Sequence, residues 1–381
     1  MINVLIVSNS LIPSVLLCGH SQMEYLESIK EVKYRFLAAS KLNDDILSWA
    51  NIIIFLRSES LIERYASDLA KKAGKHLVYV LDDDLLNIPD YLSSVAYYQR
   101  TDIKDNIKHI MANCDTFLTP SRIMVNTYGT SFNHAFTIDE PALYPIEEKK
   151  DNAITRIGFA GSIDRAQDIN DILSAALLKI SSKYGNSVSI EFIGARPAIV
   201  DELGLKHIPY QDSYAVYEEK VKEANWDIGL APMPQTAFHS CKYFNKYVEY
   251  ASFGIVGIYS NCSPYTFGIK DGYNGLLVEN DTDAWVSAIS KLIDDKALRD
   301  SMKENCLKEA RDIYNIEVLA RDYFNKIMEG YQPNDARVSG MWRYHFRCFV
   351  LKVIYKVKEQ GLNLPVWAFK KIMKKFKHER W

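Results

Sequence analysis

Short apolar runs recur along the whole chain, and longer stretches with helical periodicity separate them. Nine of these runs have the length of a strand: Asn3–Val7, Ile52–Leu56, His76–Leu81, Thr116–Thr119, Arg156–Phe159, Ser189–Ile193, Asp227–Leu230, Ile255–Tyr259 and Leu276–Val278. Strands that stay apolar, instead of alternating with polar residues, are typical of parallel sheets whose two faces are both covered by helices. The pattern therefore predicts an α/β protein.

The alternation of runs and helical stretches stops once and then starts again. The break contains Asp139–Pro145, with two prolines, and the polar run Glu147–Asn152, which together are typical of a linker. A chain of 381 residues is long enough for two cores. We therefore expect two Rossmann-like domains, residues 1–150 and 151–332, whose parallel strands end at a central cleft between them.

Several classes of protein are disfavoured by what the sequence lacks. Neither the G-x-G-x-x-G fingerprint of dinucleotide-binding enzymes nor the G-x-x-x-x-G-K-[ST] loop of P-loop NTPases is present. No apolar run approaches the roughly 18 residues of a membrane span, and no signal segment precedes the first strand. The six cysteines are scattered without a C-x-x-C pair, which favours a reducing compartment over a disulfide or zinc framework. We therefore expect a cytoplasmic protein.

The stretch from Lys242 to Gly254 has the most informative pattern of charges. Lys242 and Lys246 are four residues apart and Glu249 follows three residues later, so each pair shares a helix face. Lysines neutralise phosphates as point charges, and a carboxylate accepts hydrogen bonds from ribose hydroxyls. The pattern therefore suits a nucleotide-diphosphate sugar. The alternative is a surface helix with ordinary charge pairs.

A second candidate site follows the first strand of the second domain. Gly161 and Ser162 form a small-residue turn before a helix, where the backbone can approach a phosphate and Arg165 adds a cation. The next strand ends at Gly194, which is placed to form the floor beneath a nucleotide base. A tight strand–helix turn capped by an aspartate would give the same pattern without a ligand.

Five segments occur in an order that resembles the carboxyl-terminal domain of GT-B glycosyltransferases, particularly glycosyltransferase family 4 (glycosyl transferases group 1). They are the turn at Gly161-Ser162, the strand Asp227–Pro232, the helix Lys246–Gly254, the turn and strand Asp271–Val278, and the helix with Leu298 and Arg299. The resemblance covers about residues 156–314, and the first half matches only in its general pattern. It implies the GT-B fold and transfer of a sugar from a nucleotide-diphosphate donor.

The resemblance also implies roles for single residues. Lys246 corresponds to the family's diphosphate-binding cation and Glu249 to its ribose-binding glutamate, with Arg165 as a second phosphate contact. The family's paired glutamates lie eight residues apart, and the first position is Cys241 here, so the pattern is incomplete. Either Lys242 and its neighbours replace that contact, or the sugar-facing role lies elsewhere. His239 is a candidate sugar contact, and the alternative is a structural histidine.

Three carboxylates, Asp82, Asp83 and Asp84, follow a buried strand of the first half and should face the cleft. They are candidates for orienting an acceptor or, in the case of Asp83, for accepting its proton. Asp82 and Asp84 also have the D-x-D spacing of a Mg²⁺ or Mn²⁺ site, and a helix N-cap is the third possibility. GT-B enzymes typically use protein cations instead of a metal, so we expect no metal and no cofactor. Arg57, at another strand end, is an acceptor-facing or merely surface cation.

Residues 333–381 form a basic tail rich in aromatic residues. From Arg337 to Trp381, twelve Lys and Arg stand against two Glu, whereas the rest of the chain is acidic. Met341–Lys358 and Val366–Lys377 combine helical periodicity with these residues, as in amphipathic helices that lie on anionic membranes. A helix packed on the protein or on a partner remains an alternative. Nucleic acid is disfavoured because no nucleic-acid-binding motif accompanies the tail.

These observations lead to one functional expectation. The chain should be a GT-B transferase, peripheral on the inner face of the membrane, that moves a hexose to a glycan or lipid-linked acceptor in cell-surface polysaccharide synthesis. Retention of the anomeric configuration is implied by the resemblance alone. A nucleotide-sugar epimerase on the same fold, or a non-catalytic scaffold with a degenerate donor site, remains an alternative.

Overall fold

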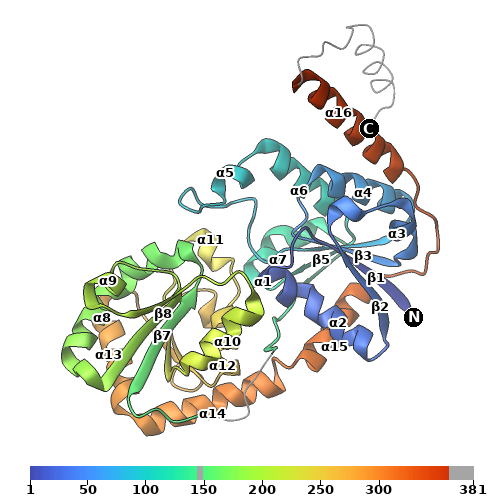
Figure 1. Ribbon diagram of the computed structural model, residues 1–381. Coiled ribbons are helices and arrows are strands. Elements are labelled where there is room, and N and C mark those ends of the chain that lie inside the picture. Colours follow the sequence, from blue (N-terminus) through green and yellow to red (C-terminus); the bar gives the residue numbers. More distant parts are fainter. Residues whose placement is uncertain (144–148, 360–381) are drawn as a thin grey trace.

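The computed structural model describes residues 1–143 and 149–359, which form two open α/β domains and a long final helix (Figure 1). Each domain contains one six-stranded sheet, and all strand pairs within both sheets are parallel. The elements of the first domain are β1 (Ile2–Val7), α1 (Pro13–Val15), α2 (Ser21–Ser28), β2 (Val32–Leu37), α3 (Asp44–Trp49), β3 (Ile52–Leu56), α4 (Leu61–Lys72), β4 (His76–Val80), α5 (Val95–Tyr98), α6 (Thr101–Asn113), β5 (Thr116–Thr119), α7 (Arg122–Tyr128) and β6 (His134–Thr137).

The second domain repeats the same plan. Its elements are β7 (Thr155–Gly161), α8 (Ala166–Tyr184), β8 (Val188–Gly194), α9 (Ile199–Leu203), β9 (Lys206–Pro209), α10 (Tyr214–Ala224), β10 (Ile228–Ala231), α11 (Ala237–Ser240), α12 (Asn245–Ser252), β11 (Val256–Ser260), β12 (Leu276–Val278), α13 (Thr282–Asp294) and α14 (Lys296–Asp312). Two further helices, α15 (Ile316–Met328) and α16 (Met341–Glu359), follow.

The strand orders determine where a ligand can bind. They are β2-β1-β3-β4-β5-β6 in the first sheet and β12-β11-β10-β7-β8-β9 in the second. In open parallel sheets a crevice forms outside the carboxyl ends of the strands where the chain reverses its winding direction. This point lies between β1 and β3 in the first sheet and between β7 and β10 in the second.

Each sheet is buried on both faces, which explains the apolar strands. In β1, Leu5 and Val7 pack in one hydrophobic cluster, whereas Val4 and Ile6 pack in another on the opposite face. All five residues of β3 are buried. The prediction of an α/β protein with covered parallel sheets is therefore confirmed.

All nine strands expected from the sequence are present, and the structure adds three. These are β2, β6 and β9, and each lies at an edge of its sheet. An edge strand is partly exposed, so it does not need a continuous apolar run. In β2, for example, Lys33 and Arg35 alternate with less exposed neighbours.

Helix α15 lies against the first domain although it follows the second in sequence. Ala320, Tyr323 and Ile327 pack in the same cluster as Val4 and Ile6 of β1, and Figure 1 shows α15 beside α2. Helix α15, which the sequence grouped with the second domain, thus packs mainly on the first, while its Leu319 packs in a cluster of the second. The chain crosses the gap between the domains twice.

Helix α16 confirms the expected helix at Met341–Lys358, and it projects away from both domains in Figure 1. Its first turns are attached to the first domain, because the rings of Tyr344 and Tyr65 stack at 5.5 Å and His345 contacts the carbonyl oxygen of Leu42 at 2.7 Å. The second stretch expected to be helical, Val366–Lys377, lies outside the described residues. Within residues 1–143 and 149–359, none of the helices combines the length and apolar character that crossing a membrane requires.

Candidate functional site

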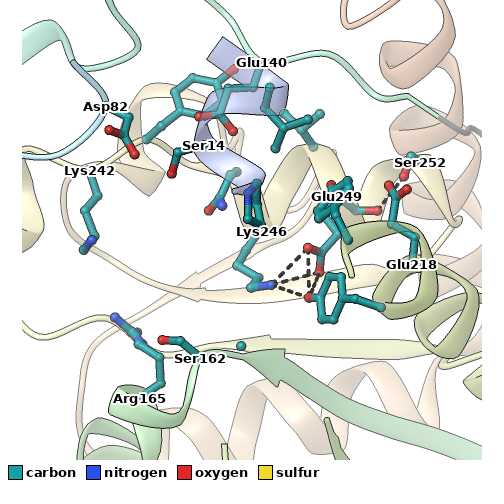
Figure 2. A pocket seen from close by; sticks show the side chains of 18 of the residues that line it. Ser14, Asp82, Glu140, Ser162, Arg165, Glu218, Lys242, Lys246, Glu249 and Ser252 are labelled. Atoms are coloured by element: carbon teal, nitrogen blue, oxygen red, sulfur yellow. Dashed lines mark hydrogen bonds and ion pairs between the residues drawn. The ribbon is translucent and has the colours of Figure 1, made fainter. Parts of the chain in front are cut away.

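A cleft of about 370 Å³ opens between the domains, at the carboxyl ends of both sheets (Figure 2). This volume falls in the usual range for small-molecule sites, about 300–1,000 Å³. Polar residues from both domains and from the connection between them line it: Ser14, Asp82, Asp83, Glu140, Ser162, Arg165, Tyr214, Tyr217, Glu218, Lys242, Lys246 and Glu249. The cleft is therefore where residues from both halves of the chain meet.

Lys246 and Glu249 meet in the cleft on the same face of α12, as their spacing predicts. The prediction that Lys242 shares a helix face with Lys246 is wrong, because Lys242 precedes the first residue of this helix. The ammonium of Lys246 lies 2.9 Å from one carboxylate oxygen of Glu249 and 2.9 Å from the hydroxyl of Tyr217 on α10. Tyr217 in turn donates to Glu249 at 2.9 Å, and burial, with the neighbouring carboxylate, raises the pKa of this phenol. The three side chains form a closed group of hydrogen bonds (Figure 2).

The turn at Gly161-Ser162 forms the wall that faces this group. Arg165, which follows the turn, lies 3.2 Å from Asp168 and also donates to the carbonyl oxygen of Pro232, after β10. Its guanidinium is therefore fixed by two partners while the side chain still lines the cleft. A cation held in this way is prepared to bind an anionic ligand.

Gly194 does not line the cleft. Its φ of +83° favours glycine, and a Cβ there would lie 2.1 Å from the carbonyl oxygen of Gly161. The residue thus allows the ends of β7 and β8 to approach closely. Its proposed role as the floor beneath a base stays a prediction.

An ion pair joins the two domains across the cleft. The ammonium of Lys242 lies 2.8 Å from Asp83, and each side chain is about one-quarter exposed. Burial alone would raise the pKa of Asp83, but Lys242 and Arg57 together hold it below its ordinary value. Asp83 is therefore a carboxylate at neutral pH.

Of the other predicted residues of this region, Asp82 lines the cleft, whereas Arg57 and Asp84 do not. Arg57 binds both carboxylate oxygens of Asp82 at 2.6 Å, and only Asp82 of this pair lines the cleft. Asp84 turns to Tyr128 and Asn87, which donate to it at 2.7 and 2.9 Å. Asp82 and Asp84 thus have different partners. Within the described residues, no group of three or more His, Cys, Asp or Glu is arranged to hold a metal ion.

His239 is buried and does not line the cleft. It contacts Thr236 at 2.8 Å and stacks on the ring of Tyr91. Burial lowers its pKa to about 4, and the cations of Arg165 and Lys242 act in the same direction. The imidazole is therefore neutral at pH 7. Cys241, where the family pattern would have a glutamate, packs in the hydrophobic core of the first domain.

Two carboxyl groups of the cleft were not predicted from the sequence. Glu140 lies in the connection between the domains, and Glu218 lies on α10 beside Tyr217. Burial raises the pKa of each to about 8, helped by Asp82 for Glu140 and by Glu249 for Glu218. A lone glutamate in a linker, or on a helix with several others, shows no pattern that sets it apart. Only the folded structure brings these two into the cleft.

The fold occurs in solved structures of other proteins. The chain aligns with HepE of Anabaena in complex with UDP-glucose at a TM-score of 0.61 and 12% identity, over 86% of this chain and 100% of that one. It aligns with a glycosyltransferase of Rickettsia africae at 0.59 and 14% identity, over 86% and 98% of the two chains. A Listeria monocytogenes protein assigned as a UDP-N-acetylglucosamine 2-epimerase aligns at 0.55 and 11% identity, over 89% and 99%.

These likenesses define the architecture of the chain. Two Rossmann-like domains with parallel sheets that face a central cleft constitute the GT-B fold, as the sequence predicted. No family model and no curated protein matches the sequence. The assignment to glycosyltransferase family 4 therefore stays a prediction.

Proposed function

We propose that the chain is a glycosyltransferase that moves a sugar from a nucleotide-diphosphate donor to a hydroxyl of a glycan or lipid-linked acceptor. The observation that carries the proposal is the cleft itself, where the Gly161-Ser162 turn and Arg165 face Lys246 and Glu249. The structural neighbours support the same donor class, because HepE was solved with UDP-glucose. A cleft with fixed cations on one wall and a carboxylate beside them suits a diphosphate joined to a ribose.

In this proposal the protein works mainly through charge. Negative charge develops on the diphosphate as the bond to the sugar breaks, and the cations of Lys246 and Arg165 stabilise it. Removing one such preorganised interaction typically slows an enzyme by about 10²–10³-fold. Lys246 would exchange Glu249 for the phosphates on binding, which frees the carboxylate of Glu249 to accept hydrogen bonds from the ribose. Closure of the two domains would exclude water from the cleft.

The acceptor side is assigned to the first domain. Asp82 and Asp83 line the cleft there, and Asp83 is ionised, so it is able to accept a hydrogen bond from an acceptor hydroxyl. We assign Asp83 this orienting role and propose retention of configuration without a metal. Arg57, which holds Asp82, is then a positioning residue.

Helix α16 supports an acceptor at a membrane surface. Trp342, Phe346 and Phe349 recur at helical spacing and are 61%, 56% and 64% exposed. The helix also carries an excess of basic over acidic residues. Exposed aromatic rings on a basic helix suit the headgroup region of an anionic membrane. A lipid-linked acceptor in cell-surface polysaccharide synthesis, on the cytoplasmic side, would match this placement.

Calorimetry with a panel of UDP, GDP and dTDP and their sugar derivatives tests the proposal. We expect one nucleotide to bind, and its sugar form to be consumed when octyl-β-glucoside, a sugar on an alkyl chain, is added as an acceptor probe. The outcome against the proposal is that none of the nucleotides binds to the folded protein. A scaffold would give that result.

An epimerase is the second candidate, because an epimerase-assigned protein shares the fold. An epimerase would act on a nucleotide sugar with no acceptor present. Product analysis separates the two activities. With octyl-β-glucoside present, a transferase forms an octyl disaccharide. With no acceptor present, an epimerase forms a free sugar or a changed nucleotide sugar.

A further inference from the structure

Glu140 is one of two buried carboxyl groups of the cleft, with Glu218, that each have one oxygen without a hydrogen-bond partner in the described part of the chain. Glu140 is only 5% exposed, and its Oε1 accepts a long hydrogen bond of 3.5 Å from the thiol of Cys18. Its Oε2 has no hydrogen-bond partner in the part of the chain that the structure describes. Buried polar atoms are nearly always partnered, because an unpartnered one costs free energy. The free oxygen of Glu140 therefore requires an explanation. Although the residue lines the cleft, this oxygen is itself covered, so it reaches a ligand only when the side chain turns toward the cleft.

The groups around Glu140 keep its carboxyl neutral. Burial and the charge of Asp82 raise its pKa to about 8, and Asp83 and Asp139 act in the same direction. The thiol of Cys18 and the phenols of Tyr214 and Tyr243 also face it, and burial raises the pKa of all three. These three groups therefore stay protonated at neutral pH. A protonated carboxyl both donates and accepts hydrogen bonds, as a sugar hydroxyl does.

The charges in the cleft are separated in space. In Figure 2, Glu140 and Asp82 lie on one side, Ser162 and Arg165 lie on the opposite side, and Lys246 lies between them. The cationic side suits phosphates. On the side of Glu140 the charge of Asp82 is balanced by Arg57, so this side suits a neutral hydroxylated group, which would meet hydrogen-bonding partners there.

We propose that the side chain of Glu140 turns toward the cleft and binds a hydroxyl group of a sugar through its Oε2, on the side of the cleft where Asp82 lies. The inference rests on the proposed function, because it names the part of the substrate that this side receives. The sugar is either the one carried by the donor or the one on the acceptor. The position of Glu140 in the connection between the domains places this contact where both substrates must meet.

The test compares Glu140→Ala and Glu140→Gln with the wild type in calorimetry and in the transfer assay. The probes are the nucleoside diphosphate that binds, its sugar form, and octyl-β-glucoside. If the donor sugar is bound, Glu140→Ala lowers affinity for the sugar nucleotide at least tenfold and changes affinity for the diphosphate less than twofold. If the acceptor is bound, both affinities stay unchanged and the KM for octyl-β-glucoside rises at least tenfold. Glu140→Gln should recover part of either loss, because an amide also donates and accepts.

The pH dependence gives a second readout. It is measured on the affinity for the sugar nucleotide if the donor sugar is bound, and on the KM for octyl-β-glucoside if the acceptor is bound. As the pH rises through about 8, the wild type should lose either its tighter binding of the sugar nucleotide than of the diphosphate or its low KM for octyl-β-glucoside. In Glu140→Gln this change should be absent. A purely structural carboxyl would not produce it.

Glu63→Gln is the matched control. Glu63 is also buried, with one carboxylate oxygen that has no partner among the described residues, but it lies at the start of α4, where glutamine can keep the capping box. The Glu63→Gln variant should change neither the affinity for the diphosphate or its sugar form nor the transfer rate. If Glu140→Ala binds both probes and transfers as well as an active wild type, the inference is overturned and the proposed function stands. If the wild type binds no nucleotide, the proposed function fails and takes this inference with it.

Discussion

Lys242 and Asp83 lie 159 residues apart in the sequence, and their side chains form a 2.8 Å ion pair across the cleft. Lys242 belongs to the second domain and Asp83 to the first. The distance between the ammonium of Lys242 and the carboxylate of Asp83 therefore depends on how far the domains are closed. A ligand that draws Lys242 toward a phosphate would release Asp83.

This pair should contribute to the closed arrangement. We expect Lys242→Met and Asp83→Asn each to lower the free energy of unfolding, and the double variant to lose less than the sum, with a coupling of about 1 kcal/mol, in the range typical of contacting pairs. Small-angle scattering should show a larger radius of gyration for both single variants, because the domains separate. Simple additivity together with an unchanged radius would contradict this role.

Lys246 and Glu249 should be required for transfer and dispensable for folding. Lys246→Ala should reduce the transfer rate by about 10²–10³-fold, the usual effect of removing a preorganised charge interaction. Glu249→Ala should weaken binding of the donor and thereby reduce transfer, because it removes the proposed ribose contact. Their thermal unfolding should stay cooperative. Lys222→Ala, which removes an exposed lysine of α10, is the control and should keep full activity. Full activity in both site variants would remove the assignment.

Replacing Gly194 by alanine should destabilise the protein more than the same change at Gly204, which has a similar backbone conformation. Gly194 and Gly204 have φ values of +83° and +63°, but a Cβ at Gly204 meets no atom of the described residues within 4 Å. Gly204→Ala should therefore lower the free energy of unfolding only by the conformational cost, about 1–2 kcal/mol. Gly194→Ala should lose clearly more, because its Cβ would meet the backbone of Gly161. Urea unfolding measures both, and equal losses would argue against the close approach of β7 and β8.

The exposed rings of α16 should hold the protein on anionic vesicles. Replacing Trp342, Phe346 and Phe349 by serine should reduce co-sedimentation with phosphatidylglycerol vesicles at least tenfold, and added salt should release the wild type because the attraction of basic residues is screened. Serine at Ile313 and Val318, also exposed apolar positions, should have no effect. Equal binding of the triple variant would show that the face has another partner.

The sequence was sufficient where a structural feature depends on neighbouring residues. The central strands of both sheets are buried on two faces, so each is a continuous apolar run that can be recognised without its partners. The face shared by Lys246 and Glu249 follows from helix geometry alone, and their ion pair at 2.9 Å confirms it. The sequence therefore determined the two-domain parallel architecture and one cluster of the candidate site.

The tertiary structure decided the features that depend on distant partners. The edge strands β2, β6 and β9 were missed because a half-exposed strand has no apolar run, and its pairing partner defines it. Asp82 and Asp84 look equivalent in the sequence, yet Arg57 binds the first and Tyr128 the second. Glu140 has no distinguishing neighbours in the chain, and its carboxyl becomes neutral only because folding buries it beside Asp82. Burial and charge proximity are properties of the assembled cleft, and local sequence does not encode them by itself.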